Sequence, residues 1–199
     1  DGSYTTTQPV DPKKFGDGGQ ALQPTSITST QQTAINQTLT SHNLVYIDQS
    51  AGNGTYVKVT QTGDHNIFKA TITGPSQSIT ATQTGNYNYE DSLISGSYNT
   101  FNNTQDGNKS LFQTVSGNHN SVTTVQTGGN HYINLNIPTD YNTVSITQSG
   151  AAQKLFSLTI NSPNVGVTVQ QTNATTPDSA SMSITCTVGP CTGYTYTKN

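Results

Sequence analysis

The side chains that could do acid–base chemistry are few in this 199-residue chain, and they fall where the sequence turns. Asp64, Asp106 and Asp140 fall at expected turns, and Glu90 is the only glutamate. General acid–base catalysis requires such groups to be clustered around a substrate. Spaced along the chain, they are better interpreted as solvated charges that limit lateral aggregation. We therefore expect no enzyme activity and no catalytic residues.

Histidines are the next candidates, because imidazole is a common metal ligand. His65, His119 and His131 also fall at turns. If the repeat units described below stack at sheet spacing, His65 and His131 lie on one edge roughly 14 Å apart. That separation is too large for one metal ion. We interpret all three as surface histidines and expect neither a metal nor a cofactor.

The two cysteines lie close together, in the segment "CTVGPC" that runs from Cys186 to Cys191. They close a small loop around Gly189 and Pro190 and could pair as a disulfide, which favours an oxidising compartment. Two free thiols in a reduced cell are the alternative. The chain begins at Asp1, so either a leader has been removed or the chain has been trimmed. We expect a secreted, extracellular or cell-surface protein.

Composition excludes several classes of protein. Only 30% of the residues are hydrophobic and 9% are charged, with Thr, Asn, Gln, Ser and Gly making up most of the remainder. A net charge of -3 with seven scattered lysines argues against nucleic-acid binding. No run approaches the roughly 20 apolar residues of a membrane span.

A repeat of the form Gln-x-Gly is the strongest signal in the sequence. Its glutamines follow one another at spacings of 22, 22, 21, 22 and 22 residues. They are Gln61, Gln83, Gln105, Gln126, Gln148 and Gln170, and the glycine position two residues later holds Gly63, Gly85, Gly107, Gly128, Gly150 and Thr172.

A second series lies midway between these positions, so that the whole pattern advances by 11 residues with a single step of 10. Its members are Gly74, Gly96, Gly117, Thr139 and Asn161. Three residues after the glycine positions the chain often carries an asparagine, namely Asn66, Asn88, Asn99, Asn120, Asn142 and Asn164. Gly and Asn suit turns because they tolerate positive φ.

Between the turns, apolar and polar residues alternate with period two, as in Val57, Val59 and Gln61. This pattern predicts strand–turn–strand units. A single unit cannot bury its inner face, so the units must stack. The sequence therefore predicts an all-β protein, a β-solenoid of 22-residue rungs with Gln and Asn ladders, six to seven rungs and roughly 30 Å in length.

In such a stack the repeated glutamines lie above one another, and each side-chain amide bonds to its neighbours. The opposite strand is expected to be apolar. Glu90 interrupts its pattern, and a local bulge is expected to turn that side chain outward. The inward positions are predicted to hold Phe68, Glu90, Phe112, Ile133 and Leu155, and then Ile72, Ile94, Val115, Ile137 and Thr159.

The Gln-x-Gly-x-x-Asn pattern resembles the core of the curlin repeat, in which an alanine and a second glutamine follow. "QTGDHN" (61–66) and "QTGNYN" (83–88) match it fully, and "QDGNKS" (105–110) and "QSGAAQ" (148–153) match it in part. The likeness covers about residues 31–175. The second glutamine is replaced by Ile72, Ile94, Val115 and Ile137, and the alanine by the bulkier Phe68, Phe112, Ile133 and Leu155. The chain thus looks like a divergent curlin-like subunit with a more apolar core.

The resemblance implies an exported bacterial subunit that polymerises into extracellular amyloid-like fibres of a biofilm matrix, with secretion or nucleation proteins as further partners. The repeat supports the same expectation physically, because solenoid ends are open strand edges. Contact between unlike ends, if it does not close, generates a filament. We expect a homopolymer of identical subunits placed end to end.

Both ends of the chain depart from the repeat. Residues 1–30 contain Pro9, Pro12 and Pro24, so we expect an extended arm that serves either as a linker or export segment or as a strand docked on a neighbour. The solenoid is predicted over 31–178. Residues 179–199 are predicted to be a hairpin with a possible disulfide, which caps or extends the last rung.

Two other functions fit the same repeat. Thr60, Thr62, Thr82 and Thr84 flank the ladder glutamines, and Thr104, Thr127, Thr147 and Ser149 continue the rows. Rows of threonine on a flat solenoid suit ice or glycan binding, although Thr is also a common exposed strand residue. Stacked rungs also occur in phage and viral fibres.

Overall fold

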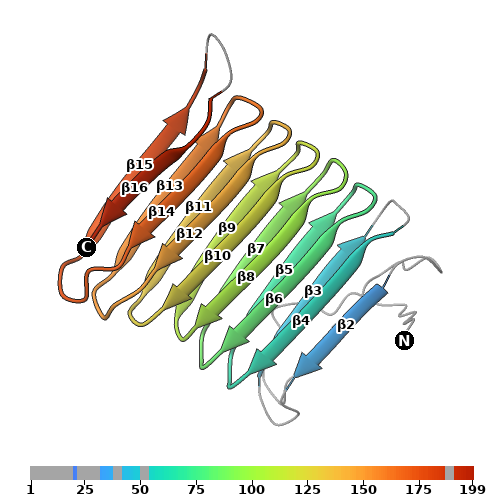
Figure 1. Ribbon diagram of the computed structural model, residues 1–199. Helices are drawn as coiled ribbons and strands as arrows, with labels where there is room; N and C mark the ends of the chain where they lie inside the picture. The colour runs from blue at the N-terminus through green and yellow to red at the C-terminus, as the bar shows by residue number, and fades with distance from the viewer. Residues whose placement is uncertain (1–19, 22–31, 38–41, 50–53, 187–190) are drawn as a thin grey trace.

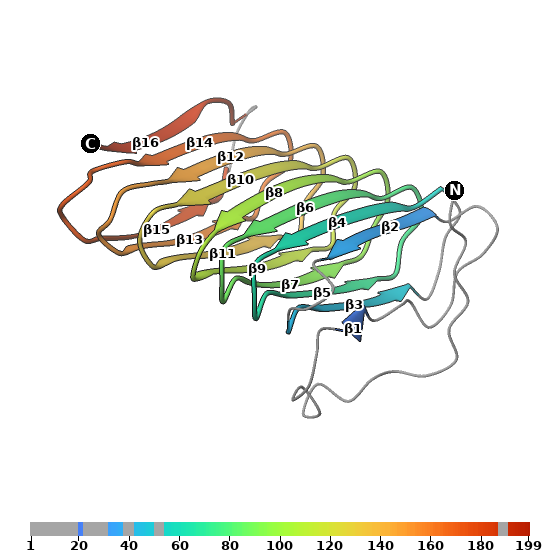
Figure 2. The ribbon, with the colours of Figure 1, turned by 90° about the horizontal axis from the view of Figure 1, so that it is seen from below.

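The computed structural model describes residues 20–21, 32–37, 42–49, 54–186 and 191–199. Within them the chain is all-β and forms a solenoid in which two parallel sheets face each other (Figures 1 and 2). Each sheet has eight strands, and the chain crosses from one sheet to the other at every turn. The described part of the chain contains no helix that could cross a membrane.

The odd-numbered strands form one sheet, here called sheet A, and the even-numbered strands form sheet B. Sheet A consists of β1 (Gln20–Ala21), β3 (Leu44–Gln49), β5 (Ile67–Ile72), β7 (Tyr89–Ile94), β9 (Lys109–Val115), β11 (His131–Ile137), β13 (Lys154–Ile160) and β15 (Asp178–Ile184). Sheet B consists of β2 (Gln32–Gln37), β4 (Tyr56–Thr62), β6 (Ser78–Thr84), β8 (Thr100–Asp106), β10 (Ser121–Thr127), β12 (Thr143–Gln148), β14 (Gly166–Gln171) and β16 (Tyr194–Lys198).

The predicted pitch is confirmed. Successive strands of sheet B from β4 to β14 begin at spacings of 22, 22, 21, 22 and 23 residues. We call the turns that lead from sheet B to sheet A the first edge, and the turns that lead back the second edge. Each rung pairs with the next in register, as shown by Gln61 opposite Gln83 and Phe68 opposite Glu90.

The core lies between the sheets, because every second residue of each strand points inward. Inward side chains that pair in register from strand to strand form columns along the solenoid. Two such columns in sheet A are largely aliphatic or aromatic, and they face two columns of sheet B that are largely apolar. The outermost column of sheet A contains Ile72, Ile94, Val115, Ile137 and Ile160, all fully buried. Branched aliphatic residues suit this environment because they pack well on a pleated surface.

Glycine is required where turns of adjacent rungs approach most closely. A Cβ atom on Gly74 would lie 1.4 Å from the carbonyl oxygen of Gly96, although the backbone of Gly74 does not have a positive φ. The turn at Gly74 can therefore stack on the turn at Gly96 at this spacing only without a side chain at position 74. Elsewhere the turns place a non-glycine residue at positive φ, as at His65 and Tyr98.

Some of the predicted inward residues are wrong, and differences in turn length explain them. The first-edge turn after Gln105 is one residue shorter than its predecessor, so Leu111 rather than Phe112 points inward. The turn after Gln148 is one residue longer than the turn before it, so Phe156 and Ile160 replace Leu155 and Thr159. A shift of one residue moves every following side chain to the other face.

The end of the chain forms another rung rather than the predicted hairpin. Strand β15 pairs with β13 in sheet A, whereas β16 pairs with β14 in sheet B, and both pairings are parallel. The two strands therefore lie in opposite sheets and extend the solenoid. Cys186 and Cys191, which follow β15, are joined by a disulfide. The predicted arm over 1–30 lies outside the described residues, apart from β1.

Candidate functional site: polar ladders and a histidine–aspartate cluster

A continuous ladder of glutamine amides runs through the core. Each Nε2 donates to the Oε1 of the glutamine one rung further on, at 2.7 Å from Gln61 to Gln83 and 2.8 Å from Gln83 to Gln105. The series continues at 3.2, 2.9 and 2.8 Å through Gln126, Gln148 and Gln171. All six side chains are buried.

The same amides also bind sheet B to sheet A. Each Nε2 donates its second proton to a backbone carbonyl of the facing sheet, as from Gln83 to Ile67 at 2.9 Å and from Gln105 to Tyr89 at 3.0 Å. Both protons of each Nε2 therefore find an acceptor in a region without solvent, where an unpaired amide costs about 1–3 kcal/mol.

The last member of the predicted ladder is wrong by one position. Gln170 is exposed and pairs with Thr147, while Gln171 occupies the ladder opposite Gln148. The longer turn after Gln148 causes this shift. The same displacement affects Asn164, which is exposed at a φ of 59°, so that Val165 takes the expected ladder position.

The second edge carries an amide ladder as predicted. The side-chain oxygen of each member accepts the backbone N–H one rung further on, at 2.8 Å from Asn120 to Asn99 and 2.9 Å from Asn142 to Asn120. Gln77 begins this ladder, and the backbone N–H of Val165 binds Asn142 at its end.

The first edge begins in the same way, with Asn43, Asn66 and Asn88 in one column. Beyond Asn88 the column changes chemistry, because Lys109, His131 and Lys154 occupy the next three rungs and are buried. Charged residues are almost never fully buried unless they are paired. These residues bind turn carbonyls instead, since Lys109 Nζ donates to Gly107 O and to Gly128 O, the latter at 2.8 Å.

His131 is therefore not the surface histidine that its position at a turn predicts. Its side chain is 2% exposed, its Nε2 lies 2.8 Å from the Thr127 carbonyl oxygen, and its Nδ1 has no partner among the described residues. Burial lowers the pKa of His131, and the positive charges of Lys109 and Lys154 lower it further. Burial likewise lowers the pKa of Lys109.

Glu90 also differs from its prediction, because it points into the core and is fully buried. Its Oε1 accepts from Asn103 at 2.7 Å and from Ser92 at 3.1 Å, whereas its Oε2 has no partner among the described residues. Burial raises the pKa of Glu90 to about 7. Gln113 and Thr124 complete a polar cluster between β7, β8, β9 and β10.

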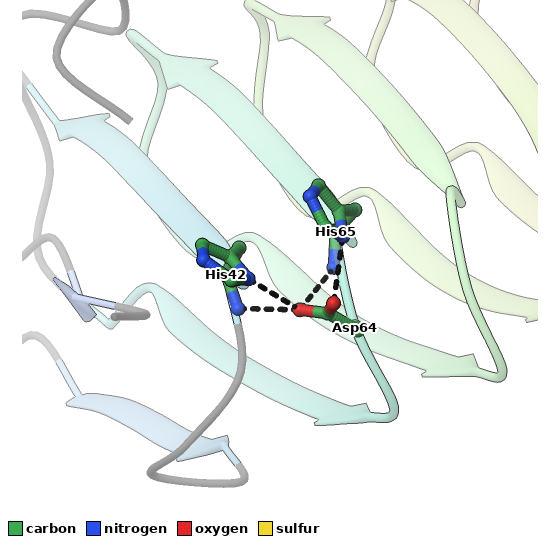
Figure 3. A group of neighbouring side chains, drawn as sticks. All are labelled: His42, Asp64 and His65. Atoms are coloured by element: carbon green, nitrogen blue, oxygen red, sulfur yellow. Dashed lines mark hydrogen bonds and ion pairs between the residues drawn. The ribbon is translucent and has the colours of Figure 1, made fainter. Parts of the chain in front are cut away.

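A cluster that the sequence analysis did not identify lies on the first edge near the start of the described solenoid. It joins His42, which precedes β3, to Asp64 and His65 in the turn between β4 and β5 (Figure 3). One Asp64 oxygen lies 3.0 Å from His42 Nδ1, and the other lies 2.8 Å from His65 Nδ1. A hydrogen bond from the His42 backbone N–H lowers the pKa of Asp64 to about 2, with the two imidazoles contributing.

The sequence contained a signal for this cluster in the dipeptide His-Asn. It occurs at 42–43 and 65–66, and the second residue is a ladder asparagine in both. A spacing of 23 rather than 22 residues placed His42 outside the counted repeat. The third His-Asn pair, at 119–120, lies on the second edge, where His119 stacks between Tyr98 and Tyr141 with centroid distances of 5.0 and 4.8 Å.

At the last rung the glutamine ladder ends on a carboxylate. Gln171 Nε2 donates to Asp178 at 2.7 Å, the Tyr196 hydroxyl donates to it at 3.1 Å, and Lys198 Nζ lies 3.6 Å away. Burial alone would raise the pKa of Asp178, but these hydrogen bonds and the Lys198 charge lower it below its usual value.

Comparison with protein-family models, with curated proteins and with solved structures gave no match.

Proposed function

We propose that this protein is a structural subunit that assembles head to tail into an extracellular, amyloid-like filament of the curli kind. The observation that carries the proposal is the register of the polar ladders. Glutamine amides stack from rung to rung between Gln61 and Gln171, so the packing of the described solenoid repeats along one axis. A further subunit continues that axis by adding its first rung to the last rung of its neighbour.

The strand edges at the C-terminal end have the geometry that such addition needs. In a parallel ladder, successive residues direct their N–H and C=O groups to alternate sides. The Asp178 N–H donates to Gln153 at 3.0 Å and the Ile184 carbonyl accepts from Asn161 at 2.8 Å, so these residues of β15 face β13. Ser179, Ser181 and Ser183 consequently direct their backbone groups outward.

Strand β16 follows the same rule. The Lys198 carbonyl accepts from Thr172 N–H at 2.9 Å, so Tyr194, Tyr196 and Lys198 face β14. Thr195 and Thr197 therefore present their backbone groups to the next subunit. In the part of the chain that the structure describes, no strand pairs with the outer edges of β15 and β16, or with those of β1 and β2 at the other end. Open edges of this kind template strand addition.

Side chains of the last rung support the same contact. The inward residues Ala180 and Met182 are half-buried, whereas their counterparts one rung earlier, Phe156 and Leu158, are each 1% exposed. A further rung stacked on β15 and β16 would bury them. Because the two ends of the solenoid are unlike, the contact is heterologous and produces an open filament.

The extracellular setting rests on two observations. Cys186 and Cys191 are paired, and disulfides persist in oxidising compartments. The glutamine and asparagine ladders also occupy the positions at which the chain resembles the curlin repeat. Both observations fit a secreted component of a biofilm matrix that partner proteins export and nucleate.

The threonine rows support an alternative less well. Thr60, Thr82 and Thr104 lie in one register on the outer face of sheet B, but Val125 interrupts the row at the next rung. An ice- or glycan-binding surface needs a longer regular array. A phage-type fibre is also less favoured, because here each rung pairs with rungs of the same chain.

A double proline variant tests the filament. Ser181→Pro together with Thr197→Pro removes two outward N–H groups, one from each sheet, and leaves the inward hydrogen bonds intact. We expect the variant to remain folded but to form no filaments by electron microscopy, whereas Ser181→Ala with Thr197→Ala forms them as the wild type does. A wild-type chain that stays monomeric at high concentration would contradict the proposal.

A further inference from the structure

The cluster of His42, Asp64 and His65 places three metal-ligand side chains at one point on the first edge (Figure 3). Their backbones belong to adjacent rungs that are already joined, since the Leu44 N–H donates to the Asn66 carbonyl at 2.7 Å. The rigid scaffold therefore fixes the spacing of the three side chains before any ligand arrives.

The Asp64 carboxylate is held in position by the backbone as well. It accepts the His42 N–H at 2.6 Å and the His65 N–H at 3.0 Å. The two imidazole rings stack at a centroid distance of 4.7 Å, and Tyr87 stacks on the other face of His65 at 4.9 Å. Stacking leaves the ring edges free, and in both rings the edge that carries Nδ1 faces the carboxylate.

We propose that His42, Asp64 and His65 form a binding site for a divalent transition-metal ion of the zinc type. The three donor atoms lie within 4.8 Å of one another. Two ligands of one Zn²⁺ at about 2.1 Å are separated by at most about 4.2 Å. Small rotations of the side chains, which are between a third and a half exposed, are enough to close the site.

The donor set selects the class of metal. Two imidazole nitrogens and one carboxylate oxygen suit Zn²⁺, Cu²⁺ or Ni²⁺, whereas Ca²⁺ and Mg²⁺ prefer oxygen ligands alone. On binding, each imidazole presents a deprotonated Nδ1 to the ion and carries its proton on Nε2. Three protein ligands leave a coordination position for water. The bound ion would join the rung of β3 to the rung of β5 beside their backbone hydrogen bonds.

The second edge provides a matched control within the same molecule. His119 has a φ of 56°, close to the 57° of His65, and it also lies between stacked rings. Its ring neighbours are Tyr98 and Tyr141 rather than a second histidine. A metal that bound any exposed turn histidine would bind both places equally, whereas the proposed site requires the pair.

The experiment titrates Zn²⁺ into the full chain, prepared without a histidine tag and stripped of metal with a chelator. His65→Asn and His119→Asn are the paired variants, because asparagine adopts positive φ readily and Asn108 already does so at 51°. We expect one Zn²⁺ per wild-type chain by calorimetry, and a loss of affinity of about tenfold or more in His65→Asn and Asp64→Asn. His119→Asn should bind as the wild type does.

A second measurement separates binding from folding. Zn²⁺ should raise the midpoint of thermal unfolding of the wild type and of His119→Asn, but not of His65→Asn, because only a ligand bound to the folded state stabilises it. The proposal is overturned if the wild type binds Zn²⁺ no better than His65→Asn, or if His119→Asn loses as much affinity. Binding to the unassembled chain does not depend on filament formation, so the two proposals fail independently.

Discussion

At the residue scale, a single ladder glutamine connects its own strand to three others. Gln83 on β6 accepts a hydrogen bond from Gln61 on β4, and it donates to Gln105 on β8 and to the Ile67 carbonyl of β5. Each of these groups depends on the others for its hydrogen bonds. The ladder therefore transmits register through the interior rather than only along the sheet hydrogen bonds.

We expect Gln83→Ala to lower the free energy of unfolding by about 2–4 kcal/mol, because it leaves two amides unpaired and opens a cavity. Chemical denaturation of the unassembled chain measures the change. Gln170→Ala is the control, since Gln170 is exposed beside the ladder and its loss should cost less than about 0.5 kcal/mol. Equal losses would show that the ladder contributes nothing specific.

Glu90 makes stability depend on pH in the direction opposite to a salt-bridged acid. Its pKa is raised from 4.5 to about 7 in the folded chain, so the folded state holds its proton more tightly than the unfolded state. The contribution of protonated Glu90 to the free energy of unfolding is fully present below pH 4.5 and is lost as pH rises through about 7. Glu90→Gln should remove this loss and stabilise the chain above neutrality by on the order of 3 kcal/mol. Unfolding midpoints across pH test it, and an unchanged profile would contradict it.

His131 acts in the acid range. Its pKa is lowered in the folded chain, so folding favours the neutral ring. The contribution of His131 to the free energy of unfolding is therefore fully present above the unfolded pKa of 6.5 and is lost as pH falls below that value. Asparagine fits this column, because Asn88 donates to the carbonyl four residues before it, at Thr84, as His131 contacts Thr127. We expect His131→Asn to flatten the acid limb of the stability profile. Retained acid sensitivity equal to that of the wild type would show that another group controls it.

At the scale of elements, the turns determine how closely rungs stack. Gly74→Ala places a methyl group against the carbonyl oxygen of Gly96, which is backbone and cannot move aside alone. We expect a loss of about 3 kcal/mol or more, measured by thermal and chemical unfolding. Gly166→Ala is the control, because its nearest contact is the Gly193 nitrogen at 3.7 Å, which is ordinary van der Waals distance. A cost as large at Gly166 would mean that crowding against the Gly96 carbonyl does not set the penalty at Gly74.

The strands and their pitch could be predicted from the sequence, because alternation and glycine spacing depend only on local chemistry. The register after each first-edge turn could not, since it depends on turn length. The turn between Gln105 and Lys109 is short and that between Gln148 and Lys154 is long, and each changes which residue enters the core. Counting from glycine to glycine hides such changes, whereas counting from one buried side chain to the next reveals them.

The interior polar groups were the hardest to predict, for a related reason. Lys109, His131 and Lys154 look like solvated turn residues until they are known to be the first residues of β9, β11 and β13. There the side chain reaches a carbonyl of its own turn, as in His131 and Lys109, or of the turn one rung further on, as in Lys109 and Lys154, so burial is tolerated. The pairing of His42 with His65 required the same knowledge of a turn that departs from the average length.

On the scale of the whole molecule, blocking the outer edges of β15 and β16 leaves the edges of β1 and β2 at the other end of the solenoid open. A chain with Ser181→Pro and Thr197→Pro retains its β1 and β2 edges, so it can still add to the C-terminal end of a growing filament. It then offers no edge for the next subunit. We expect small amounts of this variant to slow wild-type elongation, followed by light scattering from preformed seeds. If the variant did not slow elongation when it was much less abundant than the wild-type chain, filaments would not elongate at their C-terminal end.

The uneven first-edge turns suggest a practical use. The ladder glutamine and the next buried column lie four to seven positions apart, as the steps from Gln105 to Lys109 and from Gln171 to Asp178 illustrate, yet both sheets continue undisturbed. The first edge thus accepts insertions and deletions that the sheets cannot. An epitope or enzyme grafted there, for example beside Asn130, would be displayed once per copy along a fibre.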